Sequence, residues 1–227
     1  MANLVLNSRS MPARGMALPV PRPAPVGVFL GTVGLVFAAL LMGGLNIVAA
    51  GRMNPLNTTM SDYVFVPGAG WMFPAALLAM CVAGVGVGIG LWARGKLAGV
   101  LPKLSLGLAL VGLLLAAGFE TDPGDLSVSA SALIHRYAAG VVFFCVPITA
   151  VAVARRLPHR RSLYMGAAVA SVLLALFLTC HLGPMPDALG ELSGLLQRLL
   201  FCADLVVLAQ LVRVVQRPVV AQYALAA

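Results

Sequence analysis

The chain has 227 residues, of which 15 are Lys or Arg and only seven are Asp or Glu, so its formal net charge is +8. Hydrophobic residues make up 61% of it, charged residues 10%, and the mean hydropathy is +1.00. These proportions exclude a soluble globular domain, because so few charged side chains cannot cover so much apolar surface. The composition predicts a polytopic membrane protein.

Six apolar runs have the length, about 17 to 25 residues, that crosses a hydrocarbon core of about 30 Å as an α-helix. We place them in chain order near Val26 to Ala50, Trp71 to Trp92, Leu104 to Gly118, Arg136 to Ala154, Leu163 to His181, and Leu195 to Val215. The third run is the shortest and could begin at Leu101. The runs are continuously apolar and lack the alternation of barrel strands. The predicted fold is all-α, a transmembrane bundle of six spans over residues 26–217.

Two short segments flank the predicted bundle. Residues 1–25 have a proline at positions 19, 21, 23 and 25, and this spacing is incompatible with a helix. We therefore expect a flexible, proline-rich cytoplasmic arm there and a short cytoplasmic tail at residues 218–227. The first apolar run is longer than the 7 to 15 residues of a cleaved signal peptide, so we expect it to remain as the first span.

The basic residues predict the orientation of the spans. Twelve of the 15 Lys and Arg lie before the first span, in the second and fourth connections, or at the end of the chain. Lys and Arg are retained in cytoplasmic loops, so both termini are expected in the cytoplasm and the protein in the plasma membrane. The net charge is thus a topology signal, with some attraction to anionic lipid headgroups. It requires no nucleic-acid partner.

The acidic residues are predicted on the opposite side of the membrane. They are Asp62 in the first outer loop, Glu120, Asp122 and Asp125 in the second, Asp187 and Glu191 in the third, and Asp204 in the outer half of the last span. Two of the three histidines, His135 and His181, fall on the same side. We expect Asp125, Asp187 and Glu191 to be solvated. The remaining polar residues predict a site that faces the extracytoplasmic side.

Asp204 lies about six to nine residues inside the last span, at a depth of about 9 to 14 Å. An ionisable group there is costly unless it is paired or faces a wet cavity, which makes it a functional candidate. Gln197 shares its helical face, and Arg198 lies one and a half turns above it. The fourth span brings His135 and Arg136 to the same side. We predict one shared, outward-opening polar pocket.

Four alternate glycines mark the second span as a packing element. They are Gly84, Gly86, Gly88 and Gly90. Their spacing produces two faces of small residues, which allow neighbouring helices to approach closely.

The cysteines give no sign of a metal site. There is no CxxC, CxxCH or zinc-finger spacing, so we predict no metal and assign no cofactor. Cys180 and Cys202 lie toward the outer ends of the last two spans, where an oxidising compartment permits a disulfide. Two free thiols are the alternative.

Three stretches of the chain carry a resemblance to a known family. They are NPLNTTMSDYVFVPGAGWMF (54–73), FETDPGDLSVSASALIHRYAAGVVFFCVPITAVAVARRL (119–157) and GLLQRLLFCADLVVLAQLV (194–212). In order and spacing they resemble the domain of unknown function 998 family of bacterial six-helix membrane proteins. The shared elements are an SDY motif that contains Asp62 and Tyr63, an F-P-T-D-P-like element, and a histidine that opens the fourth span. Glu120 replaces the usual proline of the second element. The resemblance implies a fold and a location, and no activity.

Three functions are compatible with these residues. The first is an enzyme that acts on a lipid or prenylated substrate, with Asp122 or Asp204 as general acid and His135 as base or as the group that tunes the acid. The predicted substrate-binding residues are Asp62, Tyr63, Glu120, Arg136, His181, Gln197 and Arg198. The second function is a carrier or sensor of an ion or small solute, and the third is an accessory membrane subunit. The expected ligand is a lipid or another apolar small molecule.

Overall fold

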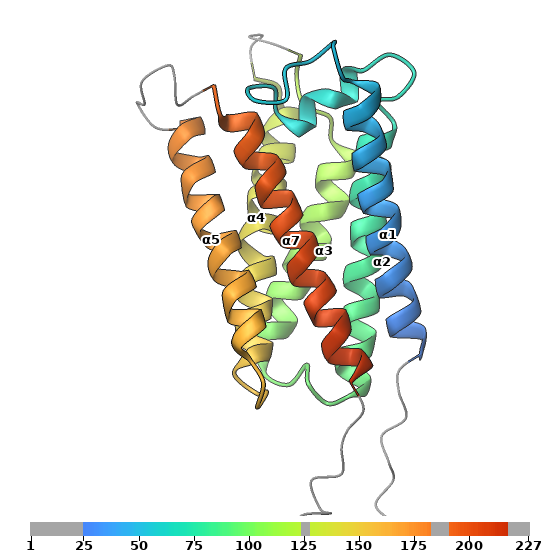
Figure 1. Cartoon of the computed structure of the whole chain (residues 1–227), viewed down its shortest axis with the longest axis vertical. Coiled ribbons are helices and arrows are strands. Elements are labelled where there is room, and N and C mark those ends of the chain that lie inside the picture. The colour runs from blue at the N-terminus through green and yellow to red at the C-terminus, as the bar shows by residue number, and fades with distance from the viewer. Residues whose placement is uncertain (1–24, 124–127, 183–190, 218–227) are drawn as a thin grey trace, which may run out of the picture.

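The computed structural model describes residues 25–123, 128–182 and 191–217, and this part of the chain is helical without strands. Six long α-helices form one bundle in which each runs antiparallel to the helix before it (Figure 1). The helices are α1 (Pro25–Val48), α2 (Met72–Ala93), α3 (Val100–Gly118), α4 (Ala130–Ala154), α5 (Arg161–Leu182) and α7 (Ser193–Gln216). A 3-10 helix, η1 (Met60–Phe65), lies between α1 and α2. All six α-helices are long and apolar enough to cross a membrane, which confirms the six predicted spans.

Helices α3 and α4 begin clearly earlier than the predicted apolar runs. Helix α4 begins at Ala130 rather than Arg136, because the hydroxyl of Ser129 accepts a hydrogen bond from the Ala132 N–H at 3.1 Å and caps the first turn. Helix α3 begins at Val100 rather than Leu104. Pro102 lies within its first turn, where a missing N–H removes no intrahelical hydrogen bond.

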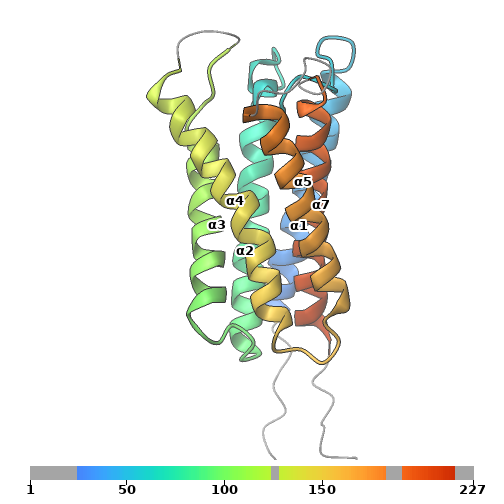
Figure 2. The ribbon, with the colours of Figure 1, turned by 90° about the vertical axis from the view of Figure 1, so that its left-hand side faces the viewer.

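Helix α7 has the most neighbours in the bundle. It packs against α1, α2, α4 and α5 (Figure 2). Its buried face includes Leu200, Val207, Leu208 and Leu211, each at most 2% exposed. Helices α1 and α5 lie at the periphery and are the least buried of the six. The last helix therefore forms much of the core, and α1 and α5 present most of their surface to lipid.

The alternate glycines of α2 pack closely against neighbouring helices. A Cβ atom on Gly86 would lie 2.7 Å from the carbonyl oxygen of Gly27, and one on Gly84 would lie 2.7 Å from Leu110 Cδ2. The first contact is with α1 and the second with α3. The expectation of two close-packing faces is confirmed, because any side chain at these positions would meet the neighbouring helix.

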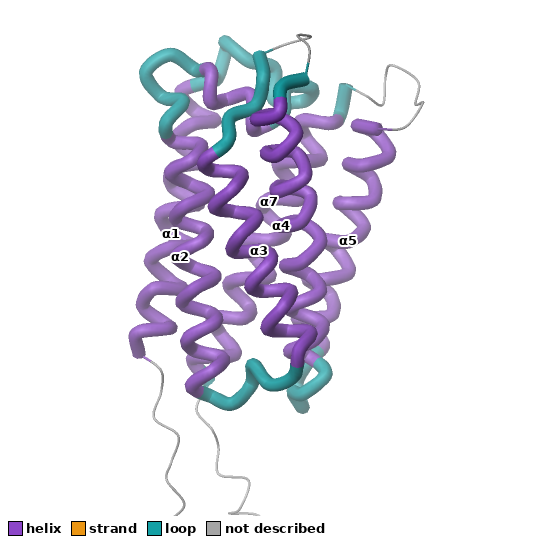
Figure 3. Tube along the Cα trace, turned by 180° about the vertical axis from the view of Figure 1, so that it is seen from behind, coloured by secondary structure: helices purple, strands orange, loops and turns teal. Residues whose placement is uncertain are grey.

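The two ends of the bundle, where the loops lie in Figure 3, differ in the charged residues that they contain. One end, which we call the basic end, consists of the connections at 94–99 and 155–160 and the end of α7 at Arg217. The other, the η1 end, consists of the described loop residues 49–71, 119–123, 128–129 and 191–192. The described acidic residues outside the α-helices all belong to the η1 end: Asp62, which lies in η1, and Glu120, Asp122 and Glu191. The side of the membrane that each end faces stays a prediction.

Candidate functional site

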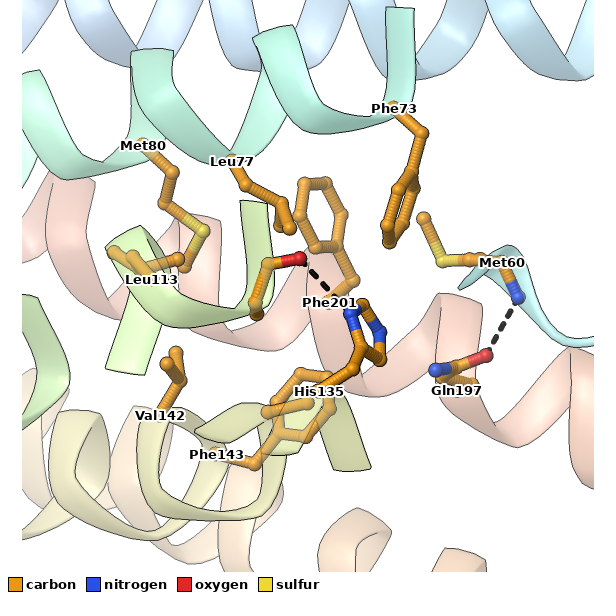
Figure 4. A pocket seen from close by; sticks show the side chains of 12 residues that line it. Met60, Phe73, Leu77, Met80, Leu113, His135, Val142, Phe143, Gln197 and Phe201 are labelled. Atoms are coloured by element: carbon orange, nitrogen blue, oxygen red, sulfur yellow. Dashed lines mark hydrogen bonds between the residues drawn. The ribbon is translucent and has the colours of Figure 1, made fainter. Parts of the chain in front are cut away.

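A cavity lies near the η1 end, enclosed by α2, α3, α4, α7 and η1 (Figure 4). Its volume is about 40 Å³, and a single water molecule needs about 10–15 Å³. The lining residues are Met60, Phe73, Leu77, Met80, Leu113, Ala116, His135, Ala139, Val142, Phe143, Gln197 and Phe201. Only His135 and Gln197 among them have polar side chains. The cavity is thus a small apolar space with two polar groups.

The hydrogen bonds of His135 determine which ring nitrogen carries the proton. The side chain is 4% exposed, and Nδ1 lies 2.9 Å from the carbonyl oxygens of both Ala116 and Phe119. Because both partners only accept hydrogen bonds, Nδ1 must be the donor. In the neutral ring Nε2 then has the free lone pair. Nε2 has no hydrogen-bond partner in the described part of the chain, and it lies on the cavity side of the ring (Figure 4).

These contacts also have a structural effect. Ala116 lies in the last turn of α3 and Phe119 follows it, and carbonyl groups at a helix C-terminus lack intrahelical partners. His135 satisfies both of them from α4. The ring also packs against Phe73 of α2, with the ring centroids 5.9 Å apart. His135 therefore joins three helices at the cavity wall.

Gln197 supplies the second polar group of the cavity. Its Oε1 atom accepts a hydrogen bond from the Met60 N–H at 2.6 Å, which fixes the orientation of the amide. The amide nitrogen is left as a donor. In Figure 4 this nitrogen points toward the side of the cavity where His135 lies. The cavity thus offers one acceptor, His135 Nε2, and one donor, Gln197 Nε2.

A second cluster of predicted site residues surrounds Arg198, outside the cavity lining. The Nε atom of Arg198 donates a hydrogen bond to Asn46 Oδ1 at 3.0 Å. Its Nη1 atom donates to the carbonyl oxygens of Thr58 and Gly194 at 2.9 and 2.7 Å. The guanidinium lies 4.9 Å from the ring centroid of Tyr63, a cation–π contact. Arg198 thereby connects α1, the first η1-end loop and α7.

Asp62 orders the same loop. Its Oδ2 accepts hydrogen bonds from the Thr59 N–H at 3.1 Å and the Thr59 hydroxyl at 2.7 Å, which forms a capping box at the start of η1. These contacts hold Met60 and Tyr63 in place. The predicted binding residues Asp62, Tyr63 and Arg198 therefore support the loop that closes the cavity.

Asp122 holds the start of α4. Its Oδ2 accepts a hydrogen bond from the Ser129 N–H at 2.6 Å. The backbone and side-chain hydrogen bonds of Ser129, with a smaller effect from Arg136, lower the pKa of this carboxyl below its ordinary value. A carboxyl group that acts as a general acid at neutral pH requires a raised pKa instead.

Two further predicted residues, Glu120 and Arg136, lie apart from the cavity. The side chains of Glu120 and Arg136 are exposed, and Glu120 contributes its peptide oxygen, which accepts a hydrogen bond from the Ser131 hydroxyl at 2.8 Å. His181 lies in α5, and its side chain is outside the described residues, as are Asp125 and Asp187.

Asp204 is completely buried in α7. It is 0% exposed, and neither carboxylate oxygen has a hydrogen-bond partner in the described part of the chain. It does not line the cavity, whose nearest lining residue along α7 is Phe201. The predicted single pocket is therefore divided into separate places, and only His135 and Gln197 meet at the cavity.

The sequence offered no signal for most of the cavity wall. Met60, Phe73 and Leu113 are ordinary apolar residues, and only helix packing brings them together. Cys180 and Cys202 are unpaired. Within the described ranges, no group of three or more His, Cys, Asp or Glu side chains is arranged to hold a metal ion.

Comparison with known proteins gives one match. A family model described as "Protein of unknown function (DUF998)" matches residues 26–214. No curated protein and no solved structure matches the chain. The matched range contains every residue that lines the cavity.

Proposed function

The chain belongs to the DUF998 family of proteins of unknown function, and we propose that this membrane protein binds a membrane-soluble alcohol in the cavity beside His135. The observation that carries the proposal is the pair of carbonyl groups on Nδ1, which leaves Nε2 as an acceptor. A hydroxyl group can donate to Nε2 and accept from the amide nitrogen of Gln197. The carbons next to the hydroxyl would lie against the apolar wall, since a space of about 40 Å³ does not hold the whole hydrocarbon chain.

The membrane supplies such ligands directly. Prenyl alcohols and other lipid alcohols combine one hydroxyl with a long apolar chain, and they are concentrated in the bilayer. We propose further that the cavity is near the extracytoplasmic side. This orientation is supported by the arginines and lysines of the opposite, basic end, because such residues are retained in the cytoplasm.

Acid–base chemistry on the bound alcohol is the enzymatic extension of this proposal. A base that accepts a hydrogen bond from a hydroxyl can take its proton as the oxygen attacks an electrophile. His135 is the group in that position. Asp122, which accepts a hydrogen bond from the Ser129 N–H, and Asp204, which does not line the cavity, have no part in it. No contact among the described residues favours a carrier or an accessory subunit over this function.

The proposal is tested by equilibrium binding to the purified full chain in phosphatidylcholine nanodiscs. The two probes are radiolabelled farnesol and its methyl ether, which has the same hydrocarbon chain and no hydroxyl hydrogen. We expect farnesol to bind about five-fold or more tightly than the ether, since one hydrogen bond is worth about 1 kcal/mol. Equal affinities would contradict the proposed contact with Nε2.

Two variants test separately the hydrogen bond to His135 Nε2 and the space in the cavity. His135→Asn retains an N–H donor for the carbonyl groups and removes the ring nitrogen Nε2 that faces the cavity, so it should abolish the preference for the alcohol. Ala139→Leu fills the cavity and should weaken both probes. Ala175→Leu adds the same bulk at an exposed position of α5 and should change neither. Farnesol binding that is unaffected by Ala139→Leu would place the ligand elsewhere.

A further inference from the structure

The basic end of the bundle contains a second, larger pocket, which lies where α5 begins and α7 ends. Its volume is about 490 Å³. Arg160, Arg161 and Arg217 line it, together with His159 and Ser162. In Figures 1 and 2 the start of α5 and the end of α7 lie at the same end of the bundle. Three arginines from two helix ends therefore line one space.

No acidic side chain balances these charges. The seven acidic residues of the chain occupy positions 62, 120, 122, 125, 187, 191 and 204, so neither connection of the basic end contains one, and none follows Asp204. The guanidinium of Arg160 lies 5.8 Å from the ring centroid of Tyr164 on α5, a cation–π contact that leaves its charge in place. The pocket is a site of uncompensated positive charge.

Neighbouring groups increase this charge. Arg94 Nη1 donates a hydrogen bond to the carbonyl oxygen of Arg217 at 2.7 Å, which brings a fourth guanidinium close to the pocket. The N-terminus of α5, a helix of 22 residues, adds its free N–H groups and the positive end of its dipole.

The apolar side of the pocket continues onto the lipid-facing surface of α5. Met165 lines the pocket and is 57% exposed, and Val169, Val172 and Leu176 follow it on one helical face with exposures of 50, 58 and 47%. A ligand with an anionic head and apolar chains matches the basic pocket and the exposed apolar face of α5 that continues from it. A free phosphate ion would contact only the basic pocket.

We propose that this pocket binds the phosphate group of an anionic phospholipid whose acyl chains lie along the exposed face of α5. Arginine suits this role because its guanidinium forms paired hydrogen bonds with phosphate oxygens. The Ser162 hydroxyl supplies a further donor. The site is at the opposite end of the bundle from the cavity beside His135 and does not depend on its function.

The first test uses the unmodified full chain in detergent micelles and native mass spectrometry. The probes are palmitoyl-oleoyl phosphatidylglycerol and the phosphatidylcholine with the same chains. We expect the anionic lipid to bind about ten-fold or more tightly, since each basic residue near a lipid surface contributes about 1 kcal/mol. Sodium phosphate and glycerol 3-phosphate, compared with sodium chloride at equal ionic strength, should not displace it. Equal binding of both lipids, or displacement by free phosphate, would overturn the proposal.

The second test compares two triple variants that remove the same charge from the basic end. Arg160→Gln/Arg161→Gln/Arg217→Gln removes the three arginines of the pocket. Arg155→Gln/Arg156→Gln/Arg213→Gln removes three exposed arginines that do not line it. We expect the first to lose about ten-fold or more in phosphatidylglycerol affinity and the second to retain most of it. An equal loss in both would show general surface attraction and overturn the proposal.

Discussion

Asp204→Leu should stabilise the protein, although it replaces the most deeply buried charged residue of the bundle. Leucine has the same branched arrangement of heavy atoms as aspartate, with two methyl groups in place of the oxygens. Asp204 is 0% exposed and both oxygens lack a hydrogen-bond partner among the described residues. An unsatisfied buried polar group costs about 1–3 kcal/mol, which the substitution recovers.

The expected gain is smaller than this, because methyl groups are larger than oxygens and overpacking offsets part of it. We expect the free energy of unfolding to rise by about 1–2 kcal/mol. The measurement is reversible unfolding in mixed micelles of dodecyl maltoside and sodium dodecyl sulfate. Asp204→Asn should stay within about 1 kcal/mol of the natural chain, since its amide is equally unsatisfied.

Val206→Leu is the matched control for this experiment. Val206 is 53% exposed on the same helix, and a change there should be smaller than about 0.5 kcal/mol. The reasoning is refuted if Asp204→Leu destabilises the protein by more than about 1 kcal/mol while Asp204→Asn does not. Asp204 would then have a partner, such as a water molecule or an ion, and the sequence-based hypothesis of a functional acid in α7 would gain support.

Three further predictions concern the packing and the loops. Gly86→Ala should cost about 1–3 kcal/mol, because its Cβ would lie 2.7 Å from a carbonyl oxygen of α1, whereas Gly140→Ala, with no atom within 4 Å, should be neutral or stabilising in the same unfolding assay. A double-mutant cycle of Ser105→Ala and Thr149→Val should give a coupling energy of about 0.6 kcal/mol for their 2.8 Å interhelical hydrogen bond, and zero coupling would contradict that contact. Because the pKa of Asp122 is lowered in the folded protein, its carboxylate contributes fully to stability above the ordinary pKa of 3.8, and this contribution is lost as the pH falls below 3.8. Thermal unfolding from pH 6 to 3 should therefore show a loss of stability that is smaller in Asp122→Asn, and identical pH profiles would exclude this role.

The sequence by itself determined the six helices and the two unlike ends of the bundle. A chain segment in hydrocarbon must satisfy its own backbone hydrogen bonds, so the length of each apolar run is enough to predict a spanning helix. Hydropathy alone predicts the start of α4 six residues late, because Ser129 caps a polar first turn that hydropathy does not detect. Capping depends on one side-chain contact rather than on composition.

The tertiary structure alone decided which polar groups meet. Helical spacing places Gln197 and Asp204 on one face of α7, but only packing decides that Gln197 reaches the cavity and Met60 while Asp204 does not line it. The partners of His135 are backbone carbonyl groups at the end of α3, and backbone atoms carry no sequence signature. The site was therefore predictable as a set of candidates and not as an arrangement. The rotation of each helix about its axis, which selects the groups that face one another, depends on contacts with all of its neighbours at once.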